Sequence, residues 1–537
     1  MKVLASRFWQ EEHAWWIDIL GLIFLGICLF MVGNGNYTLF DNSEPHYSRV
    51  AQEMVASGDY LTPHFNGHVW HVHPPLYFWL LSAHCSVWGW SDFQLRVIEG
   101  VCAIAGLLVV YQIGKEFFNR RTGLLAAVVL AASLYYVVLA RLAIFDMVLN
   151  TCLLVSIYGV LKALHHSDRS TRYWLLAGVS GGLAVLTKGP IGWVQPALAF
   201  LPFIAWQKRW AIFKDSRFWI GVAVSLAIAV PWYAHQLMHY GKEFFDVALK
   251  DYTWYRFFDV VEGQKGPWFY YFPVLLGFFP WIFYAAGAVI QAIEHKVWRS
   301  AHVYDEVIGF SWLFVGLSFI FFSFAQTKLP NYILSIFPFL SLIIAHYLLH
   351  EHHRKGLYRF LTILGPFLIS VAWMVSFRFP IPEPYTSHAV LVPQFLAILA
   401  AASWGYAVVA LRRQIFLAVG IFVTGMLIGV FFLTHTLFPA IEAYKDVRPI
   451  SQVLRSFRQP YTLIHYHFFS PSILFYANHT AVDTTRIDEV NAIARKAGSQ
   501  QVFLISDEEH LSQLKESGIK WRPVVRTYRL RLVELYR

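Results

Sequence analysis

Charged residues are scarce in this chain: Asp, Glu, Lys and Arg make up 14% of its 537 residues, whereas hydrophobic residues make up 57%. Soluble domains carry roughly 25% charged residues, so this composition excludes an ordinary soluble enzyme. The aromatic share of 18% excludes a disordered chain. The composition therefore predicts a large membrane-embedded unit joined to a smaller soluble part.

Cysteine is also rare, and the common nucleotide and metal motifs are missing. Cys28, Cys85, Cys102 and Cys152 all lie in apolar stretches and form no CxxC pair, which favours small buried side chains. The sequence contains no Walker loop, GxSxG elbow, HExxH helix or dinucleotide fingerprint. An activity driven by nucleotide binding therefore has no support in the sequence.

Long apolar runs fill the first 437 residues, and about 20 such residues make a membrane span. Candidate spans lie near residues 14–34, 93–114, 122–140, 145–165, 173–187, 190–206, 217–237, 269–292, 307–325, 331–349, 358–378, 390–411 and 415–437. The segment 75–90 is shorter and polar in places. All Lys and Arg clusters fall on one side only if 75–90 does not cross, so we predict an interfacial helix there.

This topology has about 13 spans, a cytoplasmic N-terminus and an outer C-terminus. The net charge of +10 comes from these short clusters, not from one basic stripe, so a nucleic-acid partner is not expected. The resulting fold class is an all-α polytopic membrane unit over 1–437, with outer loops at 35–92 and 235–267. Residues 438–537 have a soluble composition and predict a small α/β domain, with strands in 461–468, 501–506 and 521–537 and helices in 487–498 and 507–518.

Carboxylates at the outer ends of the spans are the candidate catalytic groups. Asp41 and Glu44 follow the first span, and Asp146 begins the span 145–165. Carboxylates near a bilayer usually face the bundle interior or a water-filled cavity, and two of them can divide the roles of general base and orienting group. The alternatives are a helix cap for the first two and an ion pair with Arg141 for Asp146.

Cations at the same level predict an anionic substrate. Lys188, Lys328 and Tyr332 lie at tight outer turns, and Arg256 lies in the second long loop. The alternative is that each Lys is a membrane anchor. His71 and His73 in the first loop are candidate ligands of a divalent metal ion, although no third ligand is evident.

The motifs that hold these residues resemble a known family. They are SEPHYSRVAQEMVASGDYLTPHFNG, HPPLYFWLL, ARLAIFDMVLNT, GGLAVLTKGPIGW, YRFF with GPWFYYFPVLLGFFPW, and FFSFAQTKLPNYILSIFPFLSLIIA, together covering about residues 35 to 350. They resemble the bacterial branch of the protein O-mannosyltransferase superfamily, and most of all the transferases that move 4-amino-4-deoxy-L-arabinose from undecaprenyl phosphate to lipid A.

The resemblance implies a GT-C fold and a glycosyltransferase of the bacterial inner membrane with a periplasmic site. Its donor would be a polyprenyl-phosphate sugar, and its acceptor lipid A, another envelope glycan or a protein Ser/Thr. It implies catalytic roles for Asp41, Glu44 and Asp146. It also implies binding of the donor lipid phosphate by His46, His73, Lys188, Arg256, Lys328 and Tyr332.

The chain departs from the family at several of these positions. Ser43-Glu44 stands where many relatives have two acids, so Asp41 or Glu44 would have to replace the missing Asp. His46 and His73 stand where relatives have other basic residues, and Val72 replaces an acid, which puts the metal site in doubt. A transporter or flippase of a lipid-linked anion and a noncatalytic assembly protein are the alternatives. Charges at outer turns, rather than near the bilayer midplane, favour an enzyme over a transporter.

Overall fold

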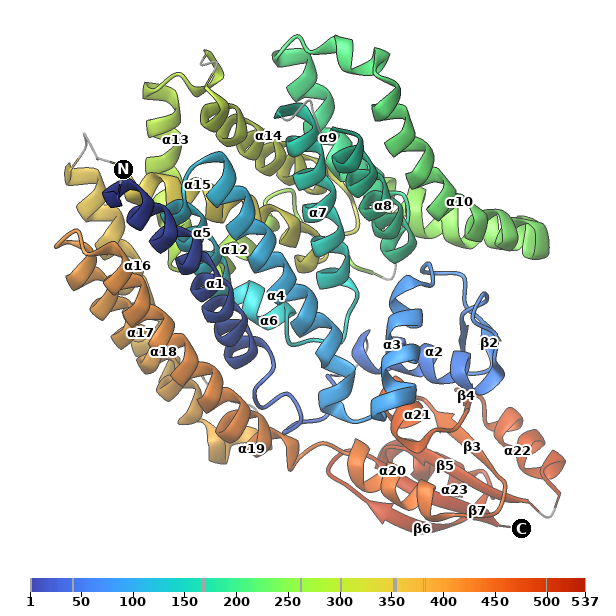
Figure 1. The fold of residues 1–537 in the computed structure, drawn as a ribbon. Helices are drawn as coiled ribbons and strands as arrows, with labels where there is room; N and C mark the ends of the chain where they lie inside the picture. Colours follow the sequence, from blue (N-terminus) through green and yellow to red (C-terminus); the bar gives the residue numbers. More distant parts are fainter. Residues whose placement is uncertain are drawn as a thin grey trace.

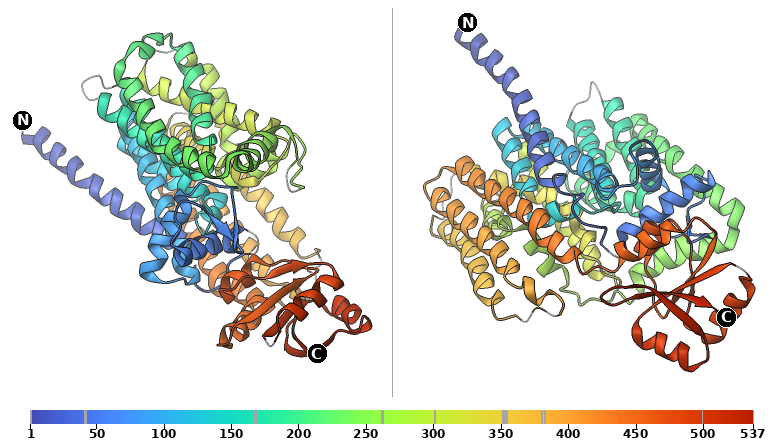
Figure 2. Two further views of the ribbon diagram at one scale, coloured as in Figure 1. Left: turned by 90° about the vertical axis from the view of Figure 1, so that its right-hand side faces the viewer. Right: turned by 90° about the horizontal axis from the view of Figure 1, so that it is seen from below.

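The computed structural model describes residues 2–40, 43–165, 170–260, 263–299, 302–350, 355–379, 381, 383–498 and 500–536, with most side chains described from residue 15 onward. A large helical body makes up most of the molecule, and a small domain of strands and helices from the C-terminal segment lies at one end of it (Figure 1). The other two views show the same separation (Figure 2).

Within the described ranges, eight helices are long and apolar enough to cross a membrane. They are α4 (Asp92–Phe117), α7 (Asp146–His165), the run Ser216–Phe258, α14 (Val303–Phe324), the run Pro330–Leu349 that contains α15 (Phe337–Leu349), α16 (Lys355–Ser376), the run Tyr385–Ala410 that contains α17 (Leu391–Ala410), and the run Ile415–Glu442 that contains α18 (Ile415–Phe432) and α19 (Phe438–Glu442). Tyr271–Phe278 and Trp281–Glu294, which include α12 (Tyr271–Leu275) and α13 (Tyr284–Glu294), are bent by 113° and would make a ninth span if counted together. The predicted multi-span helical membrane protein is confirmed, whereas the count of about 13 stays a prediction.

The remaining predicted spans are shorter or interrupted. They correspond to α1 (Lys2–Phe30), α5 (Arg120–Ala131) with α6 (Leu134–Leu139), α8 (Ser170–Lys188) and α9 (Ile191–Trp206). The predicted span 122–140 breaks at Ser133, whose backbone is extended and whose hydroxyl donates to the Val129 carbonyl oxygen at 2.8 Å. A Ser hydroxyl that bonds to nearby backbone competes with helix continuation.

The first long loop is largely folded. It contains α2 (Ser43–Ser57), a short hairpin of β1 (His64–Phe65) and β2 (His68–Val69), and α3 (Leu76–Trp88). Helix α2 ends at Gly58, whose φ of +73° is the left-handed conformation that glycine adopts without strain. Helix α3 is the segment for which we predict an interfacial position.

The second long loop, predicted at 235–267, is mostly helical. Helix α10 (Ser216–Phe244) continues through a π-helix, η3 (Phe245–Tyr255), into α11 (Arg256–Phe258). No proline occurs between Pro231 and Pro267 to stop this run, and Gly241, with a φ of +49°, only kinks it. The prediction of a loop over its first half was therefore wrong, because the aromatic and apolar residues there continue a helical pattern.

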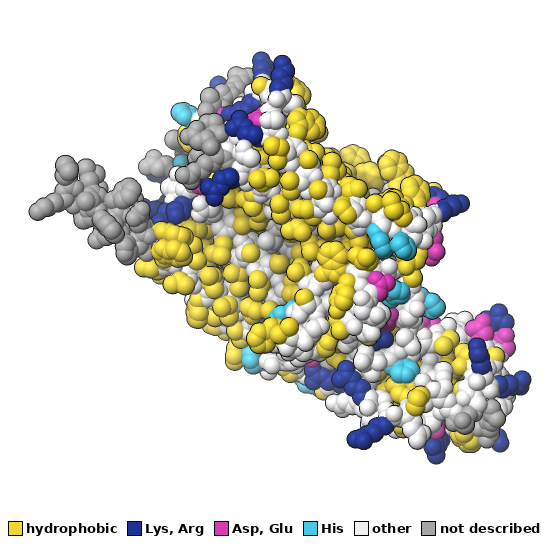
Figure 3. All heavy atoms as spheres, turned by 45° about the vertical axis from the view of Figure 1, so that its right-hand side comes forward, with side chains coloured by type: hydrophobic (Ala, Val, Ile, Leu, Met, Phe, Trp, Pro, Cys, Tyr) yellow, Lys and Arg dark blue, Asp and Glu magenta, His cyan; other side chains and the backbone are white. Residues whose placement is uncertain are grey.

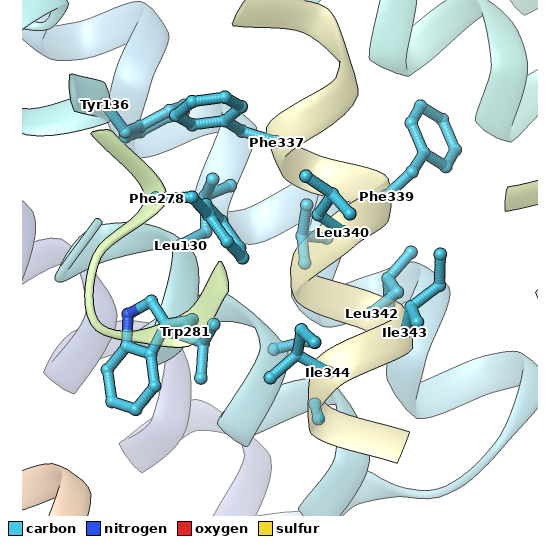
Figure 4. Packing of buried hydrophobic residues seen from close by; sticks show 14 of the residues in the cluster. Leu130, Tyr136, Phe278, Trp281, Phe337, Phe339, Leu340, Leu342, Ile343 and Ile344 are labelled. Carbon is cyan, nitrogen blue, oxygen red and sulfur yellow. The ribbon is translucent and has the colours of Figure 1, made fainter. Parts of the chain in front are cut away.

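The core of the helical body lies around α15. Side chains of α15, including Phe337, Phe339 and Leu340, pack against Leu130 of α5, Tyr136 of α6 and the bent segment that carries Phe278 and Trp281 (Figure 4). Phe339 also contacts Phe314 of α14, with ring centroids 4.5 Å apart. Helix α15 is therefore the central element, and its neighbours hold the outer ends of the other helices in fixed positions.

The C-terminal domain is an open α/β sheet. Its elements are α20 (Val447–Ser456), β3 (Tyr461–Tyr466), α21 (Pro471–Ala477), β4 (Val482–Thr484), α22 (Ile487–Lys496), β5 (Gln501–Ser506), α23 (Glu508–Glu516), β6 (Lys520–Arg526) and β7 (Arg531–Tyr536). The strand order is β4-β3-β5-β7-β6, with β3 parallel to β4 and β5, and β7 antiparallel to β5 and β6. The strands and helices predicted from the sequence are present, and sequence reasoning missed α20, α21 and β4.

This domain binds directly to the first loop. The Tyr476 hydroxyl donates a short hydrogen bond to the Asp92 carboxylate and accepts one from the Leu39 amide. Arg49 of α2 donates to the Asn478 side chain at 2.8 Å, and Asn66 of the hairpin exchanges two hydrogen bonds with the Ala481 backbone. The α/β domain therefore supports α2 and the hairpin from behind.

Candidate active site

Two cavities lie side by side where α7, α8 and α11 meet the first loop. The apolar cavity has a volume of about 360 Å³, and hydrophobic residues dominate its walls, among them Leu149, Leu153, Ile191, Val194, Phe257 and Phe322. The central chamber has about 330 Å³, and its walls include Ser43, Glu44, Tyr47, His73 and Tyr135. Both cavities are lined by Asp146, Lys188, Arg256, Asn331 and Tyr332. These shared residues form the boundary between a hydrophobic space and a polar one.

Asp146 is the first residue of α7, where the helix dipole favours a negative charge. It is 3% exposed, and its two carboxylate oxygens accept hydrogen bonds from different helices. Lys188 donates to Oδ1 at 2.6 Å, and Asn331 donates to Oδ2 at 2.7 Å. The partner of Asp146 is therefore Lys188 and not Arg141, which donates instead to the carbonyl oxygens of Leu29 and Val32.

Lys188 is placed by the turn that follows α8. Gly189 has a φ of +84°, which turns the chain sharply before α9 begins at Ile191. The Lys188 ammonium lies 4.8 Å from the ring centroid of Phe145 and 4.9 Å from that of Tyr332. Lys188 is thus held by Asp146 and by two aromatic faces, and it borders both cavities.

Glu44 lies in the wall of the chamber with both oxygens occupied. Arg96 of α4 donates to each oxygen at 2.9 Å, the Ala143 amide donates to Oε1 at 2.7 Å, and the Phe40 amide donates to Oε2 at 2.7 Å. Arg96 is fully buried. The pair joins α2, α4 and the segment before α7, so Glu44 fixes the position of the first loop. Asp41, the alternative acid, lies outside the described residues.

The two histidines predicted to bind the donor phosphate have different environments. His73 lines the chamber, whereas His46 does not. His46 is stacked on Phe65 with ring centroids 3.7 Å apart, and burial lowers its pKa to about 4. Burial also lowers the pKa of His73 well below its usual value, with further lowering by Arg256, Lys188 and His46. Both imidazoles are therefore neutral near pH 7 and supply no positive charge.

The other predicted phosphate ligands divide in the same way. Arg256 and Tyr332 border both cavities. Lys328 is 5% exposed and lines neither cavity: its ammonium donates to the Ser323 carbonyl oxygen at 2.9 Å and also bonds the Ala325 carbonyl oxygen. The backbone next to it holds Arg256, because the Thr327 amide donates to the Arg256 carbonyl oxygen at 3.2 Å.

The predicted metal ligands do not converge. His71 packs against Tyr240 and Phe244 of α10, and its Nε2 is 3.9 Å from the Glu243 carboxylate. His73 instead contacts Tyr47 and Phe145 at the chamber. Among the side chains that the structure describes, no three His, Cys, Asp or Glu residues are grouped so as to hold a metal ion. The described donors therefore do not fit a metal centre.

Sequence reasoning missed two residues of this site. Asn331 lies in the TKLPNYIL segment and bonds Asp146 across 185 positions of sequence. Arg96 is a charge inside an apolar span, and such a residue usually has a buried partner. That rule would have identified Arg96, but nothing in the sequence indicates that its partner is Glu44.

The fold and the site together define a polytopic membrane protein of the GT-C type with its polar chamber at one end of the helical body. Compared with solved structures, the chain is similar to the arabinosyl transferase ArnT from Cupriavidus metallidurans bound to undecaprenyl phosphate, with a TM-score of 0.83, 20% identity and coverage of 96% of this chain and 97% of that one. It is similar at lower TM-score, 0.52 with 12% identity, to the oligosaccharyltransferase AglB from Archaeoglobus fulgidus, over 94% of this chain and 70% of that one.

Sequence comparisons agree with the fold. Residues 72–235 match the family described as dolichyl-phosphate-mannose-protein mannosyltransferase. The chain is 26% identical over 338 residues to an undecaprenyl phosphate-alpha-4-amino-4-deoxy-L-arabinose arabinosyl transferase from Pseudomonas paraeruginosa, covering 62% of this chain and 59% of the relative. A transferase of the same name from Shewanella sediminis is 28% identical over 367 residues, covering 65% and 64%. The chain thus matches about three fifths of the length of these relatives, and the resemblance stated from the motifs is confirmed.

Proposed function

We propose that this protein is an integral membrane glycosyltransferase, which moves a sugar from a polyprenyl-phosphate donor to an acceptor of the bacterial cell envelope. One observation carries the proposal: a hydrophobic cavity and a polar chamber share a wall that contains a carboxylate and two cations. A polyprenyl-phosphate sugar has the same order of parts, with a hydrocarbon chain, a phosphate and a polar sugar. The relatives' names and the bound undecaprenyl phosphate of the similar structure support this donor class.

In the proposed complex, the hydrocarbon chain occupies the apolar cavity and the phosphate lies at its boundary with the chamber. Lys188 and Arg256 bind the phosphate oxygens through charge-assisted hydrogen bonds. They also stabilise the negative charge that develops when the lipid phosphate leaves. Arg256 is suited to this role because its planar guanidinium can form two parallel bonds with a phosphate.

The carboxylates hold this arrangement in place. Asp146 fixes the Lys188 ammonium and is itself fixed by Asn331, so it positions the cation rather than attacking a substrate. Glu44 positions α2 through Arg96. Asp41 remains a predicted catalytic acid outside the described residues. No step of this scheme passes through a metal ion, because the described donors do not fit one.

The orientation follows from the charge pattern. We infer that the protein lies in the inner membrane with the N-terminus in the cytoplasm and the chamber and α/β domain in the periplasm. The surface supports this arrangement, since hydrophobic side chains cover the middle of the helical body whereas Lys and Arg gather at its end and on the C-terminal domain (Figure 3). The chamber lies on the side of the first loop, away from the basic clusters.

A transfer assay with purified protein tests this function. Undecaprenyl-phosphate-linked 4-amino-4-deoxy-L-arabinose would serve as donor, and release of undecaprenyl phosphate would be measured by mass spectrometry. Arg256→Ala should lower kcat/KM by about 100-fold, the effect typical of a lost group that stabilises charge in the transition state. Lys250→Ala, which removes an exposed cation of η3, is the matched control and should leave the rate unchanged. Equal rates for both variants, or no release by the wild type, would contradict the proposal.

A further inference from the structure

We propose that His73 is the general base of the transfer and that the acceptor therefore reacts through a hydroxyl group. This inference rests on the proposed function and adds to it the chemical class of the acceptor. It assigns to His73 a role different from phosphate binding, the role that its position in the first loop predicts.

His73 has the position that a base requires. It is 8% exposed and lines the central chamber together with Tyr47, Asp146 and Lys188. Phe145, Tyr47 and Trp70 surround its ring, with centroids 4.6, 5.8 and 5.5 Å away. These aromatic contacts hold the imidazole in one orientation, and they leave it next to the boundary where the donor sugar and phosphate would meet.

The described carboxylates of the chamber are not available for this task. Each oxygen of Glu44 accepts from Arg96 and from a backbone amide, so Glu44 could take up a proton only by breaking a buried ion pair. Asp146 is bonded to Lys188 and Asn331. Removing one partner of such a buried pair is costly, because the other charge is left uncompensated.

The charges around His73 keep it neutral until the donor binds. Burial is the largest effect that lowers its pKa, followed by Arg256 from α11, Lys188 from α8 and His46 from α2. Across the chamber, Glu44 and Asp146 are each paired with a cation. A donor phosphate at Arg256 and Lys188 would bring a negative charge, which favours the protonated imidazole. His73 would thus become a stronger base when the donor is in place.

The step balances without an additional reactant. The acceptor oxygen forms a bond to the anomeric carbon of the sugar while the bond from that carbon to the phosphate oxygen breaks. The electron pair leaves with the polyprenyl phosphate, and the acceptor proton moves to a ring nitrogen of His73. The imidazolium then gives this proton to the departing phosphate or to water.

The charge of the chamber favours a hydroxyl over a phosphate as acceptor. Among the described residues that line it, the cations are Lys188 and Arg256 and the acids are Glu44 and Asp146. Lys188 is paired with Asp146, and the donor phosphate would engage Arg256. A second phosphate would enter without a further lining cation, and burying an unpaired charge is expensive. A hydroxyl carries no charge, but it needs a base, and His73 can act as that base.

Two simple probes distinguish the acceptor classes. The full chain in nanodiscs would receive undecaprenyl-phosphate-linked 4-amino-4-deoxy-L-arabinose with either octyl β-glucoside, which offers hydroxyls, or octyl phosphate. The variants would be His73→Gln, His73→Lys and Asp41→Asn, with His68→Gln as the control because His68 is an exposed histidine of the same loop. Binding of undecaprenyl phosphate would be measured separately by native mass spectrometry.

We expect transfer to octyl β-glucoside in preference to octyl phosphate. His73→Gln should lower kcat by about 100-fold or more with unchanged binding of undecaprenyl phosphate, which is typical of a lost general base. His68→Gln should match the wild type, and His73→Lys should remain inactive. A preference for octyl phosphate would overturn the acceptor class. An active His73→Gln or His73→Lys, or loss of transfer only in Asp41→Asn, would overturn the role of His73. If the wild type did not bind undecaprenyl phosphate, the proposed function itself would fall.

Discussion

Single buried charges in this protein are committed to particular partners, and these pairs decide which side chains remain free to react. Glu44 and Arg96 are 2% and 0% exposed and lie 52 positions apart in the sequence. Burying an ion pair is of little net benefit to stability, but breaking one is costly. The pair therefore fixes the first loop on the helical body more than it strengthens the fold.

Glu44→Gln should lower the free energy of unfolding by about 3–5 kcal/mol, because the fully buried Arg96 loses its counter-charge. Thermal unfolding of the purified protein in detergent measures this change. Arg486→Ala, which removes an exposed pair with Asp488, is the control and should leave the unfolding temperature unchanged. An unfolding temperature for Glu44→Gln equal to that of the wild type would show that the pair is not structural.

His46 should make the protein sensitive to acid. Its pKa is lowered from 6.5 to about 4 by burial, so the unfolded chain takes up a proton at a higher pH than the folded one. The stability that comes from the neutral form is complete above pH 6.5 and is lost as the pH falls towards 4. The loss amounts to about 3 kcal/mol. His46→Phe, which keeps the stacking on Phe65, should lose stability less steeply over this pH range in urea titrations, and identical slopes would refute the role of His46.

Pairs of helices approach each other at glycines. A Cβ atom added to Gly114 of α4 would lie 2.4 Å from the Gly123 Cα of α5, a distance that requires the backbones to separate. Small residues at such crossings let membrane helices pack closely. Helix α5 in turn packs on α15, so the position of α4 and of its buried Arg96 depends on this contact.

Gly114→Val should therefore destabilise the protein by at least 1–3 kcal/mol, roughly the cost of overpacking. Gly316→Val in α14 is the matched control, because no atom lies within 4 Å of a Cβ added there. Unfolding in detergent would compare the two variants. Similar losses for both would mean that helix propensity, and not the crossing of α4 and α5, explains the effect.

The complete chain places the α/β domain behind the first loop, where Tyr476, Arg49 and Asn66 join the two. With the proposed orientation, the domain lies in the periplasm and the basic connections between spans lie in the cytoplasm. Ser512→Cys, an exposed position of α23, should react with a membrane-impermeant maleimide in cells with a permeabilised outer membrane. Lys214→Cys, exposed at the opposite side, should react only after lysis. The reverse pattern would invert the topology.

Much of the fold follows from local sequence patterns. Apolar runs located α4, α7 and α14, and the glycines after residues 57, 497 and 517 marked where α2, α22 and α23 end. The prediction failed where one helix continued past its apolar run, as α10 does through η3 to Arg256. It also failed where a span was interrupted by a single hydroxyl, as at Ser133. In both cases the decisive interaction lies outside the average hydrophobicity of a window.

By itself, the sequence determined the class of protein and the side of the bilayer on which its polar groups gather, because the length of apolar runs and the spacing of basic clusters are local properties that the membrane imposes directly. The tertiary structure decided which of these groups can act. Asp146 is bound by Asn331 from 185 positions away and Glu44 by Arg96, while His73 lies neutral at the chamber wall. Partner choice and desolvation depend on which helices pack together, and a linear pattern does not contain that information.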